Sequence, residues 1–161
     1  MIELTDIEIE ELINEEKIWQ GNQRIRLTRE NGHERFNKEL ETETKNRFRV
    51  FIRQNIRDPL NFSIGLIYID RATGENISLL RCNGPTHQHP NKIEGDNTDF
   101  VCHIHRATQR YIEAGKKPEG WANETGEFNN IDSALAFFSK EVNIRPVPYL
   151  REAPPVLPEL F

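Results

Sequence analysis

The chain has 161 residues, a formal net charge of −5 and a hydrophobic content of 36%. That length suits one domain with a core of its own. No apolar run approaches the ~20 residues that cross a membrane, and the acidic start lacks the basic region of a signal peptide. Cys82 and Cys102 fall in apolar phases of expected strands, so we expect buried, reduced thiols and a cytoplasmic location.

The charge is unevenly distributed along the chain. Residues 1–16 carry seven acidic and no basic side chains, whereas residues 17–117 carry 18 basic and 12 acidic ones. A basic central segment permits contact with a phosphate backbone. Arginines on the outer face of a strand are nevertheless more often only solvated, and we expect this of most arginines outside the histidine-rich stretch.

Hydrophobic alternation predicts a series of antiparallel strands in the first two thirds of the chain. The pair Asn31-Gly32 is a strong signal for a two-residue hairpin turn. Strands are expected over residues 23–29, 33–41, 48–54, 61–70, 75–83 and 99–105.

Helices are expected on either side of these strands. The acidic segment 1–20 predicts a helix that begins at Thr5-Asp6 and runs to about Trp19. A short helix is expected from near Arg106–Thr108 to Ala114, and a closing helix from Asp132 or Ser133 to about Val142.

The predicted fold class is therefore α+β, with an antiparallel meander sheet of about five or six strands and helices packed on one face. A single domain is expected over residues 1–145, with the sheet in 23–105 and helices and a loop in 106–143. Five of the nine prolines lie in residues 146–161. We expect this tail to wrap the body or to dock on a partner.

Four of the five histidines lie in the stretch from Leu79 to His105, as two H-x-H pairs. In an extended chain, residues i and i+2 point to the same side. His87 and His89 would thus share one face of their segment, and His103 and His105 one face of theirs. If the two segments lie together, all four imidazoles can form one patch. His33, beside a hairpin turn, is expected to be an ordinary surface residue.

One use of such a patch is metal binding. Neutral imidazoles bind divalent transition metals such as zinc or manganese. The four histidines would be the ligands, and nearby carboxylates (Glu94, Asp96 and Asp99) can complete or support the coordination.

The other use is metal-free acid–base chemistry on RNA. Cleavage at a 2′-hydroxyl needs a base, an acid and a cation for the phosphate. His87, His89, His103 and His105 are candidates for the proton transfers, and Tyr111 is a further proton donor. Candidates for phosphate binding are Arg81, Arg106 and Arg110.

The pattern LLRCNG-x-x-H-x-H followed by H-I-H-x-A-T and an apolar helix resembles the TumE-like toxins of toxin–antitoxin pairs and related small prokaryotic domains. The resemblance covers about residues 60–143. The matching positions are Arg81, Asn83, His87, His89, His103 and His105, with Ser133 to Val142 as the closing helix. It implies a cytoplasmic, defence-related protein that a protein partner inhibits.

The hypothesis we favour is a toxin-like ribonuclease. The alternatives are a non-catalytic, metal-stabilised binding module that engages a host protein, and a metal-dependent small-molecule hydrolase or oxygenase. Expected partners are RNA and an antitoxin or host protein, bound through the acidic helix or the tail, with no membrane contact. Solvent access to the imidazoles discriminates between the nuclease and the binding module. An open cleft favours the nuclease, and a closed site favours the binding module.

Overall fold

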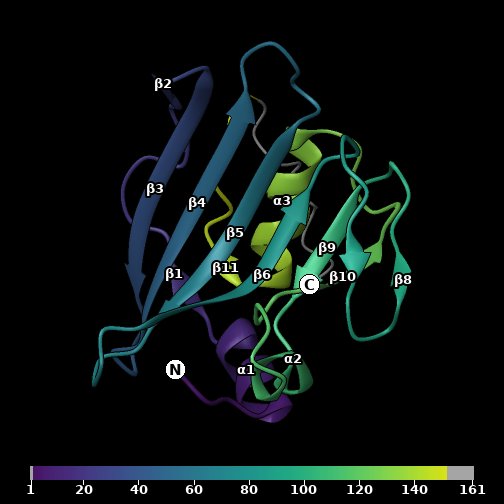
Figure 1. Ribbon diagram of the computed structural model, residues 1–161. Helices are drawn as coiled ribbons and strands as arrows, with labels where there is room; N and C mark the ends of the chain where they lie inside the picture. The colour runs from purple at the N-terminus through teal and green to yellow at the C-terminus, as the bar shows by residue number, and fades with distance from the viewer. Residues whose placement is uncertain (1, 152–161) are drawn as a thin grey trace, which may run out of the picture.

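The computed structural model describes residues 2–151 (Figure 1). The fold is α+β, as predicted, and is built around a seven-stranded antiparallel sheet in the order β10-β9-β6-β5-β4-β3-β2. Its strands follow one another as a meander, with the β7–β8 hairpin inserted between β6 and β9 and helix α2 between β9 and β10. The elements are α1 (Asp6–Asn14), β1 (Lys17–Ile18), β2 (Thr28–Glu30), β3 (His33–Glu41), β4 (Arg47–Asn55), β5 (Phe62–Ile69), β6 (Asn76–Asn83), β7 (Pro90–Asn91), β8 (Asp96–Asn97), β9 (His103–Arg106), α2 (Gln109–Glu113), β10 (Trp121–Glu124), α3 (Ile131–Glu141) and β11 (Ile144–Arg145).

Local sequence signals account for the centre of the sheet. Asn31 and Gly32 have φ values of 49° and 79°, which is the positive-φ pair that a tight hairpin between β2 and β3 requires. Along β4 the apolar positions alternate, so that Phe48, Val50 and Ile52 are at most 1% exposed and lie in the core.

One face of the sheet is covered by α3, which packs against β5 and β6 (Figure 1). Leu135 and Phe138 of α3 are buried in the main core together with the apolar side chains of these strands. The helix begins after Asn130, whose side chain accepts a hydrogen bond from the Ser133 amide at 2.8 Å. The predicted caps Asp132 and Ser133 are therefore wrong, because both residues already lie within the helix.

Long-range pairing shortens two of the predicted elements. α1 ends at Asn14 instead of continuing to Trp19, because Lys17–Ile18 pairs in parallel with β11. The strand predicted over 23–29 is ordered as part of the seven-stranded sheet only from Thr28. Its first residues bond to a distant segment instead, since the Ile25 amide donates to the Tyr149 carbonyl at 2.8 Å.

The predicted proline-rich tail thus contacts the body at Tyr149, and its residues 152–161 lie outside the described part of the chain. No helix among the described residues is long and apolar enough to cross a membrane. Cys82 and Cys102 are buried free thiols, as expected.

The face of the sheet opposite α3 is called the open face here. A β-bulge determines which side chains of β6 reach it, because Ser78 pairs with Ile67 while Leu80 pairs with the adjacent Leu66. Leu79 is the extra residue, and it reverses the alternation beyond it. Leu80 and Cys82 therefore enter the core, whereas Arg81 and Asn83 point to the open face.

Candidate functional site

Three of the four predicted histidines meet on the open face. His103 and His105 lie on β9, directly opposite Asn83 and Arg81 of β6. His89 comes from the loop after β6, and its ring centroid lies 4.4 Å from that of His105 and 6.3 Å from that of His103. The centroids of His103 and His105 are 5.1 Å apart. We call His89, His103 and His105 the histidine cluster.

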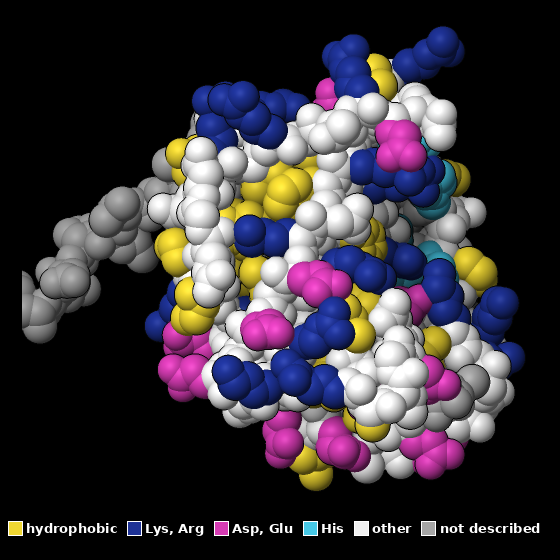
Figure 2. Space-filling model, turned by 90° about the vertical axis from the view of Figure 1, so that its left-hand side faces the viewer, with side chains coloured by type: hydrophobic (Ala, Val, Ile, Leu, Met, Phe, Trp, Pro, Cys, Tyr) yellow, Lys and Arg dark blue, Asp and Glu magenta, His cyan; other side chains and the backbone are white. Residues whose placement is uncertain are grey.

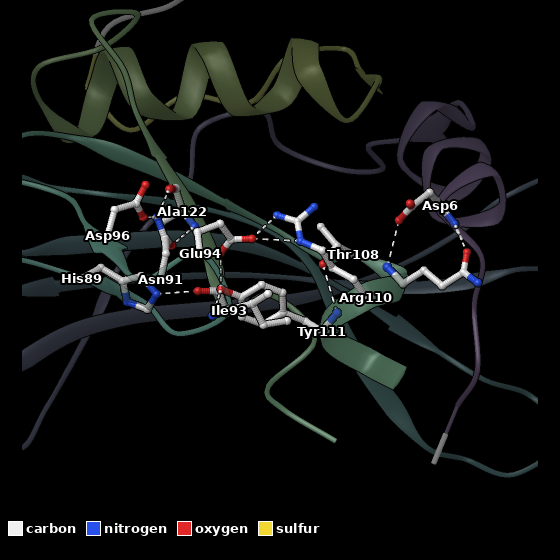
Figure 3. Close-up of polar contacts among 12 residues, drawn as sticks. Asp6, His89, Asn91, Ile93, Glu94, Asp96, Thr108, Arg110, Tyr111 and Ala122 are labelled. Atoms are coloured by element: carbon white, nitrogen blue, oxygen red, sulfur yellow. Dashed lines mark hydrogen bonds and ion pairs between the residues drawn. The ribbon is translucent and has the colours of Figure 1, made fainter. Parts of the chain in front are cut away.

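Asn91 holds the loop that carries His89 in place. Its buried side chain accepts from the Ala122 amide at 2.8 Å and donates to the Ala122 carbonyl at 3.0 Å (Figure 3). Ala122 is itself paired with His105 across β9 and β10. The His89 amide and carbonyl bond to Thr98 at 2.9 Å each, which closes the loop on itself.

Backbone carbonyls fix the orientation of all three rings. The Nδ1 atoms of His103 and His105 lie 3.0 Å and 2.9 Å from the carbonyls of Val101 and Glu119, and Nε2 of His89 bonds to the Gly120 carbonyl. A carbonyl can only accept, so each of these nitrogens carries the hydrogen. The opposite nitrogen of each neutral ring is left with a lone pair.

The two imidazoles on β9 are held neutral. His103 and His105 are each only 1% exposed. Burial, together with the charge of Arg81, lowers the pKa of His105 to about 2. Burial also lowers the pKa of His103, and His89 and Arg81 lower it further. Neither ring is therefore protonated at neutral pH.

Arg81 is the only one of the three predicted phosphate-binding arginines that lies at the cluster. It is half-buried, and burial lowers its pKa, which the charge of Glu119 raises in turn. Its Nε is buried without a hydrogen-bond partner. Within residues 2–151 no carboxylate forms an ion pair with it.

Arg106 lies elsewhere. It follows His105 on β9 and therefore points to the other face of the sheet, where its guanidinium bonds to Glu10 of α1 at 3.2 Å and to Glu141 of α3 at 3.0 Å. The prediction that Arg106 lies with the histidines is wrong, because alternation along the strand separates the two. Arg106 instead ties two helices to the sheet.

Arg110 and Tyr111 on α2 are bonded to Glu94 and not to the histidines, although Tyr111 lines the same pocket as His89 (Figure 3). The Tyr111 hydroxyl donates to Glu94 at 2.6 Å, and Arg110 Nε donates to the same carboxylate at 2.9 Å. Burial and the hydrogen bond to Glu94 raise the pKa of Tyr111. This hydroxyl is therefore a poor proton donor to a substrate.

His89 opens onto solvent through a pocket of about 390 Å³. The pocket carries three exposed lysines, and we call it the lysine pocket. It is lined by His89, Pro90, Lys92, Tyr111, Gly115, Lys116, Lys117 and Gly120. His87, the fourth predicted histidine, is exposed and is close enough for its charge to lower the pKa of His103.

The chemistry of the imidazoles favours metal binding, whereas their arrangement in the structure does not. Imidazoles whose second nitrogen donates to a carbonyl are typical metal ligands. However, no group of three or more His, Cys, Asp or Glu in residues 2–151 is placed to hold an ion. Arg81 also adds positive charge beside the rings. Zinc or manganese binding by the histidines therefore stays a prediction.

A family model matches residues 4–144, which include every residue of this site. The chain belongs to the family of unknown function DUF6978. No curated protein and no solved structure matches it. Nothing in these comparisons bears on the resemblance to TumE-like toxins, which stays a prediction.

Several residues of this DUF6978 site escape sequence reasoning. Asn91 and Glu119 lie in segments that read as polar loops, and only the folded chain shows that the first anchors His89 and the second faces Arg81. His33 was expected to be an ordinary surface residue, yet it lines a pocket on the open face together with Arg53 and His87. The H-x-H spacing was the one signal that pointed to the region.

Proposed function

We propose that the chain is a toxin-like ribonuclease that cleaves single-stranded RNA at the histidine cluster. The observation that carries the proposal is the position of His89. It is the accessible member of three packed imidazoles and lines a pocket with three lysines, on the same face as Arg81. Imidazole for proton transfer and cations for phosphate are the groups that such a cleavage needs.

Each group has a defined task in this reaction. The lone pair on Nδ1 of His89 accepts the proton of the 2′-hydroxyl, because Nε2 donates to Gly120. The 2′-oxygen then bonds to phosphorus, and the bond from phosphorus to the 5′-oxygen breaks. His87 donates a proton to that leaving oxygen. The products are a 2′,3′-cyclic phosphate and a 5′-hydroxyl end, and water returns the proton from His89 to His87.

The remaining charged groups serve the phosphate and the base. Arg81 and the lysines of the lysine pocket stabilise the negative charge that grows on phosphorus oxygens. His103 and His105 are positioning residues, because their buried, neutral rings fix the orientation of His89. A transition metal bound by the histidines would supply a Lewis acid in place of the cations.

The wider role follows from the same proposal. A toxin of this kind acts in the cytoplasm and needs an inhibitor. The acidic outer surface of α1, with Glu8, Glu10 and Glu11 exposed, is a candidate contact for a basic segment of that protein partner.

The test is a cleavage assay with an end-labelled single-stranded RNA and the DNA of the same sequence, in the presence of EDTA. We expect cleavage of the RNA alone, with 2′,3′-cyclic phosphate ends. His89→Ala is expected to lower the rate at least 100-fold, whereas Gln88→Ala, an exposed neighbour in the same loop, keeps it. A wild-type protein that leaves the RNA intact, or a His89→Ala variant that cleaves normally, rejects the proposal.

A non-catalytic binding module is the second candidate, and the burial of His103 and His105 favours it. Two imidazoles at 1% exposure cannot touch a substrate. In this reading the cluster only stabilises the fold, so His105→Ala lowers the melting temperature and wild-type protein shows no RNA cleavage. A His105→Ala variant that melts like wild type would count against it.

A further inference from the structure

A second pocket lies on the open face and shares no lining residue with the lysine pocket. It has a volume of about 200 Å³. Its ionisable side chains are basic, and its other side chains include hydrogen-bonding amides and a hydroxyl. We call it the arginine pocket, lined by His33, Arg53, Asn61, Phe62, Ser63, Asn83, Gly84 and His87.

The sheet register explains why these residues meet. Arg53, Ser63 and Asn83 occupy directly opposed positions on β4, β5 and β6, so their side chains form a row across the open face. His103 continues this row on β9. The arginine pocket therefore lies beside the histidine cluster, and His87 at its rim is the proposed acid of the cleavage.

His33 fixes the orientation of the Arg53 guanidinium, and no carboxylate of the described residues forms an ion pair with it. Nη2 of Arg53 lies 3.1 Å from Nε2 of His33, and Nδ1 of His33 lies 3.3 Å from the Asn31 carbonyl. His33 thus donates through Nδ1 and accepts the Arg53 hydrogen through Nε2. Within residues 2–151 Arg53 has no ion pair. An anion is the ligand that this guanidinium lacks.

Two polar atoms at or near the pocket are without a partner. The side-chain oxygen of Asn83, in the pocket lining, is buried without a hydrogen-bond partner. Nε of Arg35 is likewise unpaired, and Arg35 lies outside the lining, directly opposite Arg53 on the sheet. A buried polar atom without a partner is uncommon and calls for an explanation. Both atoms are buried, so they mark incomplete pairing beside Arg53 and are not themselves contacts for a ligand.

An aromatic platform lies next to the pocket. Phe51 is two residues before Arg53 on β4, on the same open face, and is half-buried. Its ring covers Gly65 of β5, since a Cβ at Gly65 would lie 2.2 Å from the ring. A ring laid flat over a glycine in the middle of a sheet leaves its outer side free to stack on a base.

The positive charge extends further than one phosphate. Arg49 and Arg53 are four residues apart on β4, or about 13 Å along an extended strand. Figure 2 shows Lys and Arg side chains next to histidines toward the right-hand edge of that view. A surface with separated cations and a stacking ring fits a strand of nucleotides better than a single one.

We propose that the open face binds single-stranded RNA, with a backbone phosphate in the arginine pocket and a base stacked on Phe51. The choice of RNA as the ligand rests on the proposed function. The binding itself does not require cleavage, so the two can fail independently.

The test uses a fluorescent 2′-O-methyl RNA of eight nucleotides, which has no 2′-hydroxyl to react. Binding is measured by fluorescence anisotropy at 50 mM salt. Arg53→Gln is expected to weaken binding about tenfold, and Phe51→Leu, which keeps the apolar contact with Gly65, about five- to tenfold. The matched control is Arg145→Gln on β11, an exposed arginine outside the seven-stranded sheet, which is expected to bind like wild type.

The outcomes separate the two proposals. Binding that depends on Arg53 and Phe51 supports this inference even when the wild-type protein cleaves no RNA. Cleavage with wild-type binding in both variants overturns it and leaves the ribonuclease intact. If Arg145→Gln weakens binding as much as Arg53→Gln, or a poly-glutamate peptide competes as well as unlabelled RNA, the face attracts polyanions in general and the inference is also overturned.

Discussion

At the scale of single residues, the site depends on charges that the sheet brings next to each other. Arg81 and His105 are opposed on β6 and β9, and the guanidinium adds to the effect of burial in keeping that imidazole neutral. A neutral ring can accept a hydrogen bond through its free nitrogen and still donate to Glu119. Arg81 thus helps to fix the protonation state of the cluster, and in the proposed ribonuclease it also attracts phosphate.

Replacing Arg81 with Met removes its charge and tests the electrostatic role. Without the positive charge the imidazolium form of His105 is less disfavoured, so its pKa rises from about 2, while burial keeps it below the ordinary 6.5. NMR titration of the histidine ring signals measures this shift. A His105 titration that is the same in Arg81→Met and wild type would contradict the electrostatic role. Lys in place of Arg81 is the control, because it keeps the charge.

At the scale of elements, two helix ends meet on one buried lysine. Lys17 is 0% exposed, and its Nζ lies 2.7–2.9 Å from the carbonyls of Leu12, Ile13, Glu15 and Val142. These carbonyls end α1 and α3, where backbone acceptors lack partners within the helix. The lysine therefore joins the first helix to the last. This contact explains why α1 ends at Asn14, three residues before Lys17.

Stability should depend on pH through this lysine. Burial lowers the pKa of Lys17 to about 7, from 10.5 in an exposed chain. Between these values the unfolded chain binds more protons than the folded one, so the free energy of unfolding rises from pH 7 toward pH 9.5. The rise over this range is at most about 3 kcal/mol, and the four carbonyls reduce it by favouring the ammonium. Urea denaturation of wild type and Lys17→Met checks this, because the variant lacks the slope.

The loop that carries His89 depends on one amide. Asn91→Ala removes two hydrogen bonds to Ala122 and leaves its backbone groups unpaired, at a cost of about 1–3 kcal/mol. We expect the sheet to persist, the Ala122 amide to exchange faster with solvent, and ring contacts between His89 and His105 to be lost in NMR spectra. If those ring contacts survive, Asn91 does not position the loop. Asn97→Ala, an exposed residue of the same hairpin, is the control.

Sequence reasoning succeeded where the signal is local. The Asn31-Gly32 turn and the alternation of β4 predict the meander directly. It failed where partners are distant in sequence, as at Lys17–Ile18, which pairs with β11. The bulge at Leu79 cannot be recognised in the sequence, because Leu79 and Leu80 are both apolar. It nevertheless determines that Arg81 points toward the histidines. The H-x-H spacing located the cluster, while its anchors come from loops whose path only the fold defines.

At the scale of the whole molecule, the outer side of α1 and the open face of the sheet carry opposite charge. The outer side of α1 is acidic, while the open face presents Arg35, Arg49 and Arg53 without carboxylate partners in the described part of the chain. The net charge of −5 thus conceals a cationic face. A polyanion is attracted to that face by a field that salt weakens.

This field makes a quantitative prediction for RNA binding. Each phosphate neutralised on a single strand lowers the logarithm of the binding constant by roughly 0.7 per tenfold increase in salt. Arg53→Gln removes one such contact, so the slope of the salt dependence becomes shallower by about 0.7. Phe51→Leu weakens binding without changing the slope, because stacking releases no counterions. Anisotropy titrations of the 2′-O-methyl RNA from 50 to 200 mM salt measure both, and equal slopes in wild type and Arg53→Gln would place the phosphate elsewhere.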